Sequence, residues 1–326
     1  MTRDAFERAL TTRFGDRVRR EAALAPLTTF KVGGPADWLL DLNAVEDLRA
    51  AVVMAADHGI PLVALGGGSN VLVPDAGIRG LVIRLRGGSV ARIGDDGVRA
   101  DGGVTINGLV RWTVSHGLAG LEAWAGTPGT VGGAVHGNAH FRGRLISELI
   151  SSASLLSRRG ELRAVPAAAM EFGYDTSRLQ RTGEILVSAD FVVSPGDPEQ
   201  LRATARESLA FRKRTQPLAS PSAGCIFQNP DPARDAVPDG IPMSAGALVD
   251  RAGLKNAAEG PARVSPTHGN FIVNEGGATA ASIRALIERC KSGVRDRFGV
   301  ELREEIVYLD AAANPRGEVT NDDVAD

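Results

Sequence analysis

The chain has 326 residues, and its 37 lysines and arginines nearly balance its 39 aspartates and glutamates, for a formal net charge of −2. This length predicts two or three compact units, and the near-zero charge disfavours nucleic acid or an anionic membrane surface as a partner. The only cysteines, Cys225 and Cys290, lie far apart without a metal-ligand pattern, which argues against disulfides and a zinc site and fits a reducing compartment. No apolar run has the length of a membrane span and no signal-peptide core is found, so we expect a cytoplasmic protein.

The first two thirds of the chain predict a mixture of helices and strands. A helix is expected over residues 2–14, and the Gly-Gly-Pro within residues 28–36 predicts a turn. Beyond this turn, segments with strand-like and helix-like hydrophobic periods alternate, as in a small mixed α/β unit. Strands are predicted over residues 38–42, 61–65, 80–85, 150–156, 162–165 and 185–193, and helices over residues 45–58 and 106–116.

The last third repeats this mixture and begins with a helix over residues 199–211, near whose start we place a domain boundary. The helix is expected to end in the basic cluster Arg212, Lys213 and Arg214, because Thr215-Gln216-Pro217 follows. Further helices are predicted over residues 245–252 and 278–298, and strands over residues 271–273 and 306–309. Cys290 shares the apolar face of the long helix and is expected to be buried there. The polar tail from residue 310 is expected to be disordered.

Two glycine-rich segments stand out. The first glycine loop, residues 65–70 (LGGGSN), follows one apolar run and precedes another, so it is expected to turn between two strands. The second glycine loop, residues 121–139 (LEAWAGTPGTVGGAVHGNA), places five glycines within a dozen residues. Backbone without Cβ atoms can approach a phosphate closely and present free N–H groups to it. Two such loops in one chain predict a single extended ligand gripped at two points.

Neither glycine loop matches a common nucleotide-binding motif. No Gly-Lys-Ser/Thr follows, as a P-loop requires, and the glycine spacing is not that of a Rossmann dinucleotide site. Each loop alone could be no more than a tight corner. The segment Thr127 to Ala134 is more specific, because a Pro-Gly turn and hydroxyl groups lead into a helix start where a pyrophosphate fits. Together the loops favour a nucleotide cofactor.

Four segments carry a resemblance to a known family. They are the first glycine loop with Ser69 and Asn70, the Thr-Pro-Gly-Thr-Val-Gly-Gly-Ala segment with Asn138, and the C-terminal blocks SAGCIFQNP (residues 222–230) and HGNFIVN (residues 268–274). Over residues 28–309 the chain resembles UDP-N-acetylenolpyruvoylglucosamine reductase, in the compact, type II-like form that lacks a substrate-covering loop. The two glycine loops are shared with a wider superfamily of FAD-binding domains, whereas the C-terminal blocks point to this reductase.

The resemblance implies an α+β fold, with a two-part FAD-binding domain of the PCMH type followed by a smaller α/β substrate-binding domain. The implied parts are an N-terminal helix (residues 1–20), the FAD-binding domain (21–196), the substrate domain (197–310) and a disordered tail (311–326). FAD would be held noncovalently and NADPH would be the reductant. The residues that would hold FAD are Gly66, Gly67, Gly68, Ser69, Asn70, Thr127, Pro128, Gly129, Thr130, Gly132, Gly133, Ala134 and Asn138.

The resemblance also implies a reaction and its residues. NADPH reduces FAD, and hydride then passes to the β-carbon of UDP-N-acetylglucosamine enolpyruvate, giving UDP-N-acetylmuramate for peptidoglycan precursor synthesis. An acid must deliver a proton to the α-carbon. Cys225 stands where the family usually has a serine, and a thiol is a better acid than an alkanol. Glu305 matches the family's C-terminal catalytic glutamate.

Two positions depart from the family pattern, and at one of them Val307 stands where some relatives have another arginine. The family commonly has Tyr-Arg where this chain has Tyr174-Asp175, and an aspartate beside a carboxylate substrate would repel it. Either Arg178 or a basic residue from elsewhere supplies the missing charge, or the substrate differs. Residues expected to bind the substrate are Tyr174, Arg212, Arg214, Gly224, Asn229 and Lys255.

The sequence is compatible with two other functions. The chain could be another FAD-dependent oxidase or dehydrogenase of the same superfamily, although the C-terminal blocks would then be unexplained. It could also be a nonenzymatic nucleotide-binding module, a reading that Asp175 suggests. We expect a monomer that acts on a small sugar nucleotide and binds neither nucleic acid nor membrane.

Overall fold

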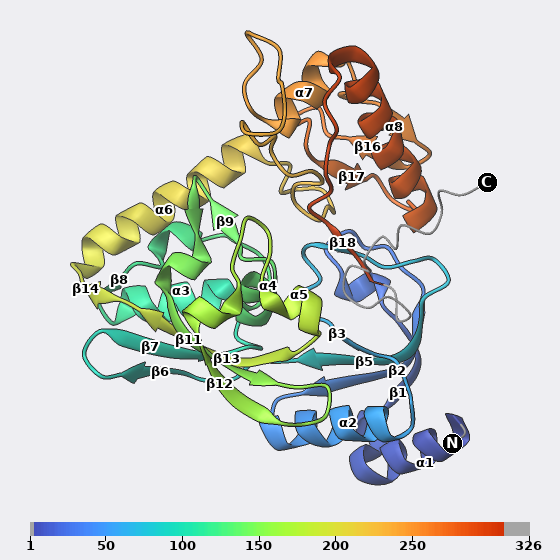
Figure 1. Cartoon of the computed structure of the whole chain (residues 1–326), viewed down its shortest axis with the longest axis vertical. Helices are drawn as coiled ribbons and strands as arrows, with labels where there is room; N and C mark the ends of the chain where they lie inside the picture. The colour runs from blue at the N-terminus through green and yellow to red at the C-terminus, as the bar shows by residue number, and fades with distance from the viewer. Residues whose placement is uncertain (1–2, 310–326) are drawn as a thin grey trace.

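The computed structural model describes residues 3–309, which form a two-part N-terminal region and a C-terminal domain (Figure 1). The first part is a four-stranded sheet of order β1-β2-β5-β3 with two helices. Its elements are α1 (Arg3–Phe14), β1 (Arg19–Ala23), β2 (Pro35–Leu42), α2 (Val45–Asp57), β3 (Leu62–Ala64) and β5 (Ile78–Leu85). β2, β5 and β3 run parallel, whereas β1 is antiparallel to β2.

Alternating side chains of β2 give this sheet two apolar faces. Trp38 and Leu40 pack with Phe6 of α1 and Leu48 of α2 in one core. Leu39, which points the other way because successive strand residues alternate, belongs to a separate small core. The first glycine loop leaves β3 at the carboxyl end of this parallel arrangement.

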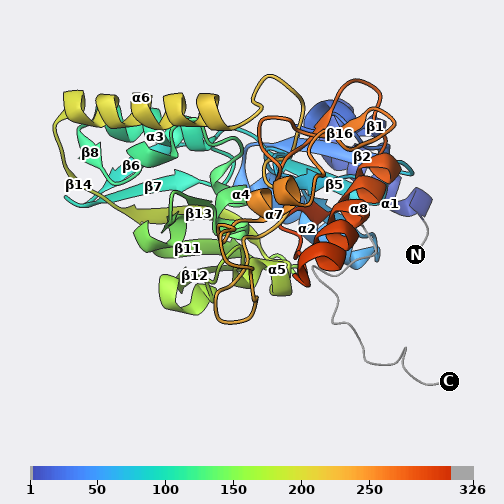
Figure 2. The same ribbon diagram turned by 90° about the horizontal axis from the view of Figure 1, so that it is seen from above.

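The second part is a five-stranded antiparallel sheet of order β12-β11-β13-β7-β6. Its strands are β6 (Val90–Ile93), β7 (Gly97–Asp101), β11 (Ile150–Leu156), β12 (Leu162–Pro166) and β13 (Ile185–Val192). α3 (Ile106–Ser115) and α4 (Val131–His136) pack with it around the fully buried Trp124. The long helix α6 (Pro198–Thr215) lies beside α3 (Figures 1 and 2).

The C-terminal domain packs α7 (Ala245–Arg251) and α8 (Ala280–Phe298) against a small sheet of order β15-β16-β17. The strands are β15 (Ala258–Glu259), β16 (Ala262–Val264) and β17 (Ile272–Asn274). Cys290 is buried in this core with Ile283 and Leu286, as the sequence predicted. The chain then returns to the first part, where β18 (Val307–Tyr308) pairs in parallel with β4 (Val71–Leu72), just after the first glycine loop.

The elements predicted from apolar periodicity are all present, with ends shifted by a few residues. β1, β6 and β7 were not predicted; β1 is exposed at most positions, so its sequence lacks the alternation of a half-buried strand. The remaining short elements are β8 (Leu118–Ala119), β9 (His140–Phe141), β10 (Arg144–Leu145), α5 (Arg178–Thr182) and β14 (Ser194–Pro195). The tail from residue 310 lies outside the described residues. No described helix combines the length and apolarity needed to cross a bilayer.

The contacts of helix α6 assign it to the second part of the N-terminal region. It contacts α3 and the turn η3 (Glu122–Trp124), and its Leu201 lies in the core of the second part. Arg212, near its C-terminal end, hydrogen-bonds Thr127 of the second glycine loop. We therefore propose that the C-terminal domain begins after Thr215 rather than at residue 197.

Candidate active site

The two glycine loops touch each other. A Cβ atom built on Gly67 would lie 2.5 Å from Cα of Gly129, and one on Gly66 would lie 2.8 Å from Oγ1 of Thr130. Gly68 has φ +63°, and its Cβ would lie 2.2 Å from the carbonyl oxygen of Leu27. These positions exclude side chains on steric grounds. The loops therefore meet at one place, as the prediction of a ligand gripped at two points requires.

A cavity of about 1890 Å³ runs from the paired glycine loops to the C-terminal domain. It exceeds the roughly 300–1,000 Å³ of an ordinary ligand pocket and can take two large ligands at once. Within the described chain, the N–H groups of residues 66–70 donate to no protein acceptor. Consecutive free N–H groups are suited to phosphate oxygens, so the first glycine loop fits the pyrophosphate of a dinucleotide.

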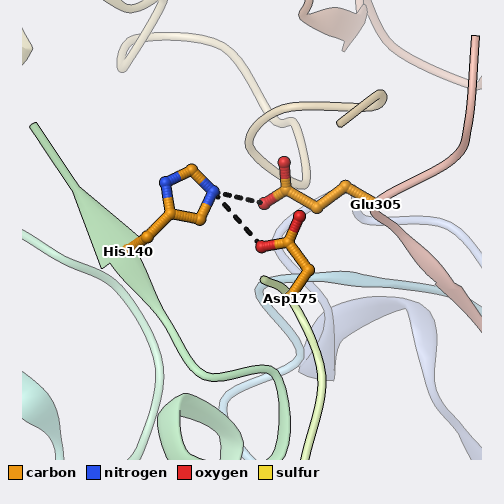
Figure 3. Close-up of side chains that lie close together, drawn as sticks. All are labelled: His140, Asp175 and Glu305. Carbon is orange, nitrogen blue, oxygen red and sulfur yellow. Dashed lines mark ion pairs between the residues drawn. The ribbon is translucent and has the colours of Figure 1, made fainter. Parts of the chain in front are cut away.

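Three ionisable side chains converge in the cavity wall (Figure 3). Nε2 of His140, from β9, lies 3.2 Å from Oδ1 of Asp175 and 3.8 Å from Oε1 of Glu305. Asp175 is 5% exposed and has φ +57°. One nitrogen and two carboxylate oxygens within 4.8 Å of one another are also a donor set that a divalent cation can use.

Glu305 is fixed through its backbone. Its N–H donates to the carbonyl of Ile226 at 2.8 Å, and its carbonyl accepts from the Asn70 side chain at 3.2 Å. Burial raises the pKa of its carboxyl well above the usual range; Asp175 raises it further, and His140 partly offsets both. At neutral pH this carboxyl is therefore protonated in a large share of the molecules.

Cys225 lies one residue before Ile226, after Gly224 with φ +80°. Burial raises the pKa of the thiol, the Glu305 and Asp175 carboxyls raise it further, and Arg212 lowers it. The thiol therefore keeps its proton at neutral pH. Since Ile226 binds Glu305 through the backbone, the thiol and this carboxyl belong to one site.

Arg212 is the arginine whose positive charge acts on the Cys225 thiol. It is 6% exposed, donates from Nη2 to Oγ1 of Thr127 at 2.7 Å and lies 3.9 Å above the Phe141 ring. Burial lowers its pKa to about 10, so it stays charged at neutral pH. Its Nε is buried without a hydrogen-bond partner among the described residues. A buried donor left free in a cavity wall indicates a bound polar ligand.

Comparisons with known proteins agree with this geometry. Residues 38–165 match an FAD-binding domain, and residues 216–309 match the C-terminal domain of UDP-N-acetylenolpyruvoylglucosamine reductase. The reductase of Heliobacterium modesticaldum is 39% identical over 96% of this chain and 98% of its own length, and that of Bacillus velezensis is 39% identical over 90% and 94%. The chain belongs to the UDP-N-acetylenolpyruvoylglucosamine reductase family. A crystal structure of the Thermus caldophilus reductase is 32% identical, covers 90% of this chain and 99% of its own, and superimposes with a TM-score of 0.75.

Membership of the reductase family makes the chain an FAD-dependent oxidoreductase of α+β fold, as predicted. The predicted FAD contacts in both glycine loops line the cavity, with one exception. Asn138, near the end of the second glycine loop, is fully buried, and there its Nδ2 donates to the carbonyl of Gly173 and its Oδ1 accepts from the N–H of Ser147. Its role here is to hold the segment that carries Asp175.

Arg178 does not reach the reductase cavity. Its Nε pairs with Glu184 at 2.9 Å, and its Nη1 donates to the carbonyl of Ala169. Arg178 therefore neutralises the buried Glu184 carboxylate and does not supply the charge expected beside the substrate carboxylate. The sequence could not show this, since the ion pair depends on how α5 docks.

The expected substrate residues divide into two groups. Gly224, Asn229 and Arg212 line the cavity, and the ring of Tyr174 lies 4.9 Å from that of His140 and is tilted against it. Lys255 pairs with Asp250, and Arg214 lies 5.9 Å above the Phe211 ring; neither lines the cavity.

His140 is the residue that sequence reasoning missed. Asp175 was the available signal, because a buried carboxylate needs a cationic partner, and the chain has only five histidines.

Proposed function

We propose that the protein uses electrons from NADPH to reduce UDP-N-acetylglucosamine enolpyruvate to UDP-N-acetylmuramate, a step of peptidoglycan precursor synthesis and so of cell-wall growth, cell shape and division. The observation that carries this proposal is the pair of hydrogen bonds that connect the Glu305 backbone to Ile226 and to Asn70. It joins the carboxyl, the Cys225 segment and the first glycine loop in one cavity, so that groups of the C-terminal domain face the FAD-binding region.

The reaction needs a hydride, a proton and control of negative charge. The two glycine loops would hold FAD, which, once reduced by NADPH, would supply the hydride for the β-carbon of the enolpyruvyl group. The α-carbon then becomes nucleophilic and takes the proton of the Cys225 thiol. Arg212 stabilises the thiolate that remains, because it is the cation that lowers the pKa of Cys225. Solvent returns a proton to the sulfur after the product leaves.

Glu305 serves the same step as a hydrogen-bond donor. Its raised pKa keeps the carboxyl protonated in a large share of molecules at neutral pH, and a neutral carboxyl can donate to an oxygen on which negative charge develops. Asn229, which lines the cavity, and Tyr174, whose ring lies beside that of His140, are suited to the sugar nucleotide. We further propose that the enzyme acts as a cytoplasmic monomer without nucleic-acid or membrane partners, in line with its near-zero net charge.

Isotope placement tests this function. The protein is incubated in D₂O with NADPH and the enolpyruvyl nucleotide, and the product is analysed by NMR and mass spectrometry. The proposal predicts UDP-N-acetylmuramate with solvent deuterium on the α-carbon, where an acid in exchange with water delivers its proton. Recovery of unchanged substrate while NADPH is consumed would instead indicate an oxidase of the same superfamily.

A further inference from the structure

The active site contains two carboxyl groups where its substrate brings a third. Asp175 and Glu305 both face Nε2 of His140, and Asp175 raises the pKa of Glu305. Like charges brought together in a poorly solvated wall are costly unless a cation lies between them. Even while Glu305 holds its proton, the Asp175 carboxylate and the substrate carboxylate need a cation close by.

In the part of the chain that the structure describes, neither Arg178 nor Arg212 forms an ion pair with Asp175 or Glu305. Arg178 pairs with Glu184, and Arg212 donates to Thr127 and packs over Phe141. Among the described residues, the ion pairs of Asp175 and of Glu305 are both with His140.

The surrounding structure holds the imidazole in this position. His140 lies in β9, paired with β10, and its ring lies against that of Tyr174. Asp175 is presented by a left-handed backbone conformation, which a non-glycine residue adopts only when its surroundings support it. Gln180 helps by donating to the Asp175 carbonyl at 2.8 Å. Nε2 of His140 and Oδ2 of Asp175 are buried without a conventional hydrogen bond among the described residues, so the contact is an ion pair.

We propose that the imidazolium of His140, anchored by Asp175, is the cation that positions Glu305 and balances the carboxylate charge of the site during reduction of the enolpyruvyl group. This rests on the proposed function and assigns a positioning residue to its site. An arginine at this place would carry a permanent charge. Here the charge is titratable, and Asp175 serves as its anchor rather than as a ligand of the substrate.

The pH dependence follows from the charges around the ring. Burial lowers the pKa of His140, but the close contact with Asp175 and the charges of Glu305 and Asp175 outweigh burial, and Arg212 opposes them; the net effect raises the pKa. Tyr174, which also faces the ring, stays neutral because burial raises its own pKa. The imidazolium is thus present at neutral pH and is lost as the pH rises through the raised pKa of His140.

The test compares His140→Gln with His140→Lys and His140→Arg, in anaerobic stopped-flow measurements of the two half-reactions across pH. His140→Gln should bleach the flavin with NADPH at the normal rate, but slow reoxidation by the enolpyruvyl nucleotide on the order of 10²-fold. A lysine or arginine should restore most of this rate and carry it to higher pH, because these side chains stay charged. His116→Gln is the matched control, since this exposed histidine stacks on Trp112 outside the cavity.

Three outcomes would overturn the proposal. Normal reoxidation by His140→Gln would remove the need for the cation. Failure of both cationic variants, with normal flavin spectra, would mean that the ring shape matters and not its charge. Activity lost to EDTA and restored by a divalent metal would mean that the cation is a metal ion. If the unmodified protein itself is not reoxidised by the nucleotide, the proposed function fails first, before any variant is compared.

Discussion

The side-chain amide of Asn70 donates a hydrogen bond of 3.2 Å to the backbone carbonyl of Glu305, 235 positions later in the chain. The backbone carbonyl of Asn70 accepts a second bond, of 3.0 Å, from the N–H of Val307. Asn70 ends the first glycine loop, and Glu305 carries the carboxyl of the substrate site. The segment that leads into β18 thereby sets the distance between the first glycine loop and the catalytic groups.

Replacing Asn70 should loosen this connection. Asn70→Ala removes one hydrogen bond to a backbone carbonyl, which costs about 1 kcal/mol of unfolding free energy, and should slow substrate-driven flavin reoxidation roughly 10-fold through misplacement of Glu305. Stopped-flow absorbance and thermal unfolding measure the two effects. The exposed Asn43 provides the control; an Asn70→Ala enzyme that behaves like Asn43→Ala would show that the tie is not needed.

Contact between the glycine loops predicts that Gly67 tolerates no side chain. Gly67→Ala places a methyl group 2.5 Å from Cα of Gly129, so the loops must separate and FAD should be lost on gel filtration. Gly137→Ala is a suitable comparison, because its methyl group would lie 3.8 Å from the Gly133 carbonyl oxygen, which is an ordinary van der Waals contact. Retention of stoichiometric FAD by Gly67→Ala would contradict the proposed loop contact.

Replacing each cysteine in turn should distinguish a catalytic thiol from one that only packs in a core. Cys225→Ala should leave flavin reduction by NADPH near normal and slow reoxidation by 10²-fold or more, the usual cost of removing a general acid. Cys290→Ala removes a sulfur from the buried face of α8, so it should lower the melting temperature and leave both half-reactions intact. Equal losses in both half-reactions of Cys225→Ala would remove its role as the acid.

Arg178→Ala should reduce stability rather than catalysis. Burial raises the pKa of Glu184, but hydrogen bonds from Thr182, Arg163 and Arg178 outweigh it and hold the pKa below its usual value. A depressed folded-state pKa stabilises the protein above the unfolded pKa of glutamate, and this stability is lost as the pH falls through the folded value.

The Arg178→Ala variant should therefore unfold at lower denaturant concentration at neutral pH and differ less from the parent in acid. Arg181→Ala, which breaks an exposed pair with Glu171, should cost little. A selective loss of substrate turnover with unchanged stability would instead return Arg178 to the active site.

The sequence predicts those parts of the fold that have regular apolar periods. β11 and α3 were placed almost to the residue, because each has one face in the core of the second part. β1 and the β9–β10 pair were missed, since an exposed strand and a two-residue bridge have no such period.

For the site, the glycine loops and the Cys225 segment could be found from sequence because their chemistry is local. The partner of Asp175 could not be found in this way. His140 lies 35 positions earlier and contacts Asp175 only because β9 packs against the segment that Asn138 holds. Arg178 is close to Asp175 in sequence and yet binds Glu184, so proximity along the chain was a poor guide to the missing cation.

The most direct measurement is anaerobic reoxidation of the reduced flavin. The purified protein is bleached with a stoichiometric amount of NADPH and then mixed with UDP-N-acetylglucosamine enolpyruvate without oxygen. We expect full return of the yellow colour, with one UDP-N-acetylmuramate formed per flavin. A flavin that stays bleached with this nucleotide and recovers only when air is admitted would contradict it.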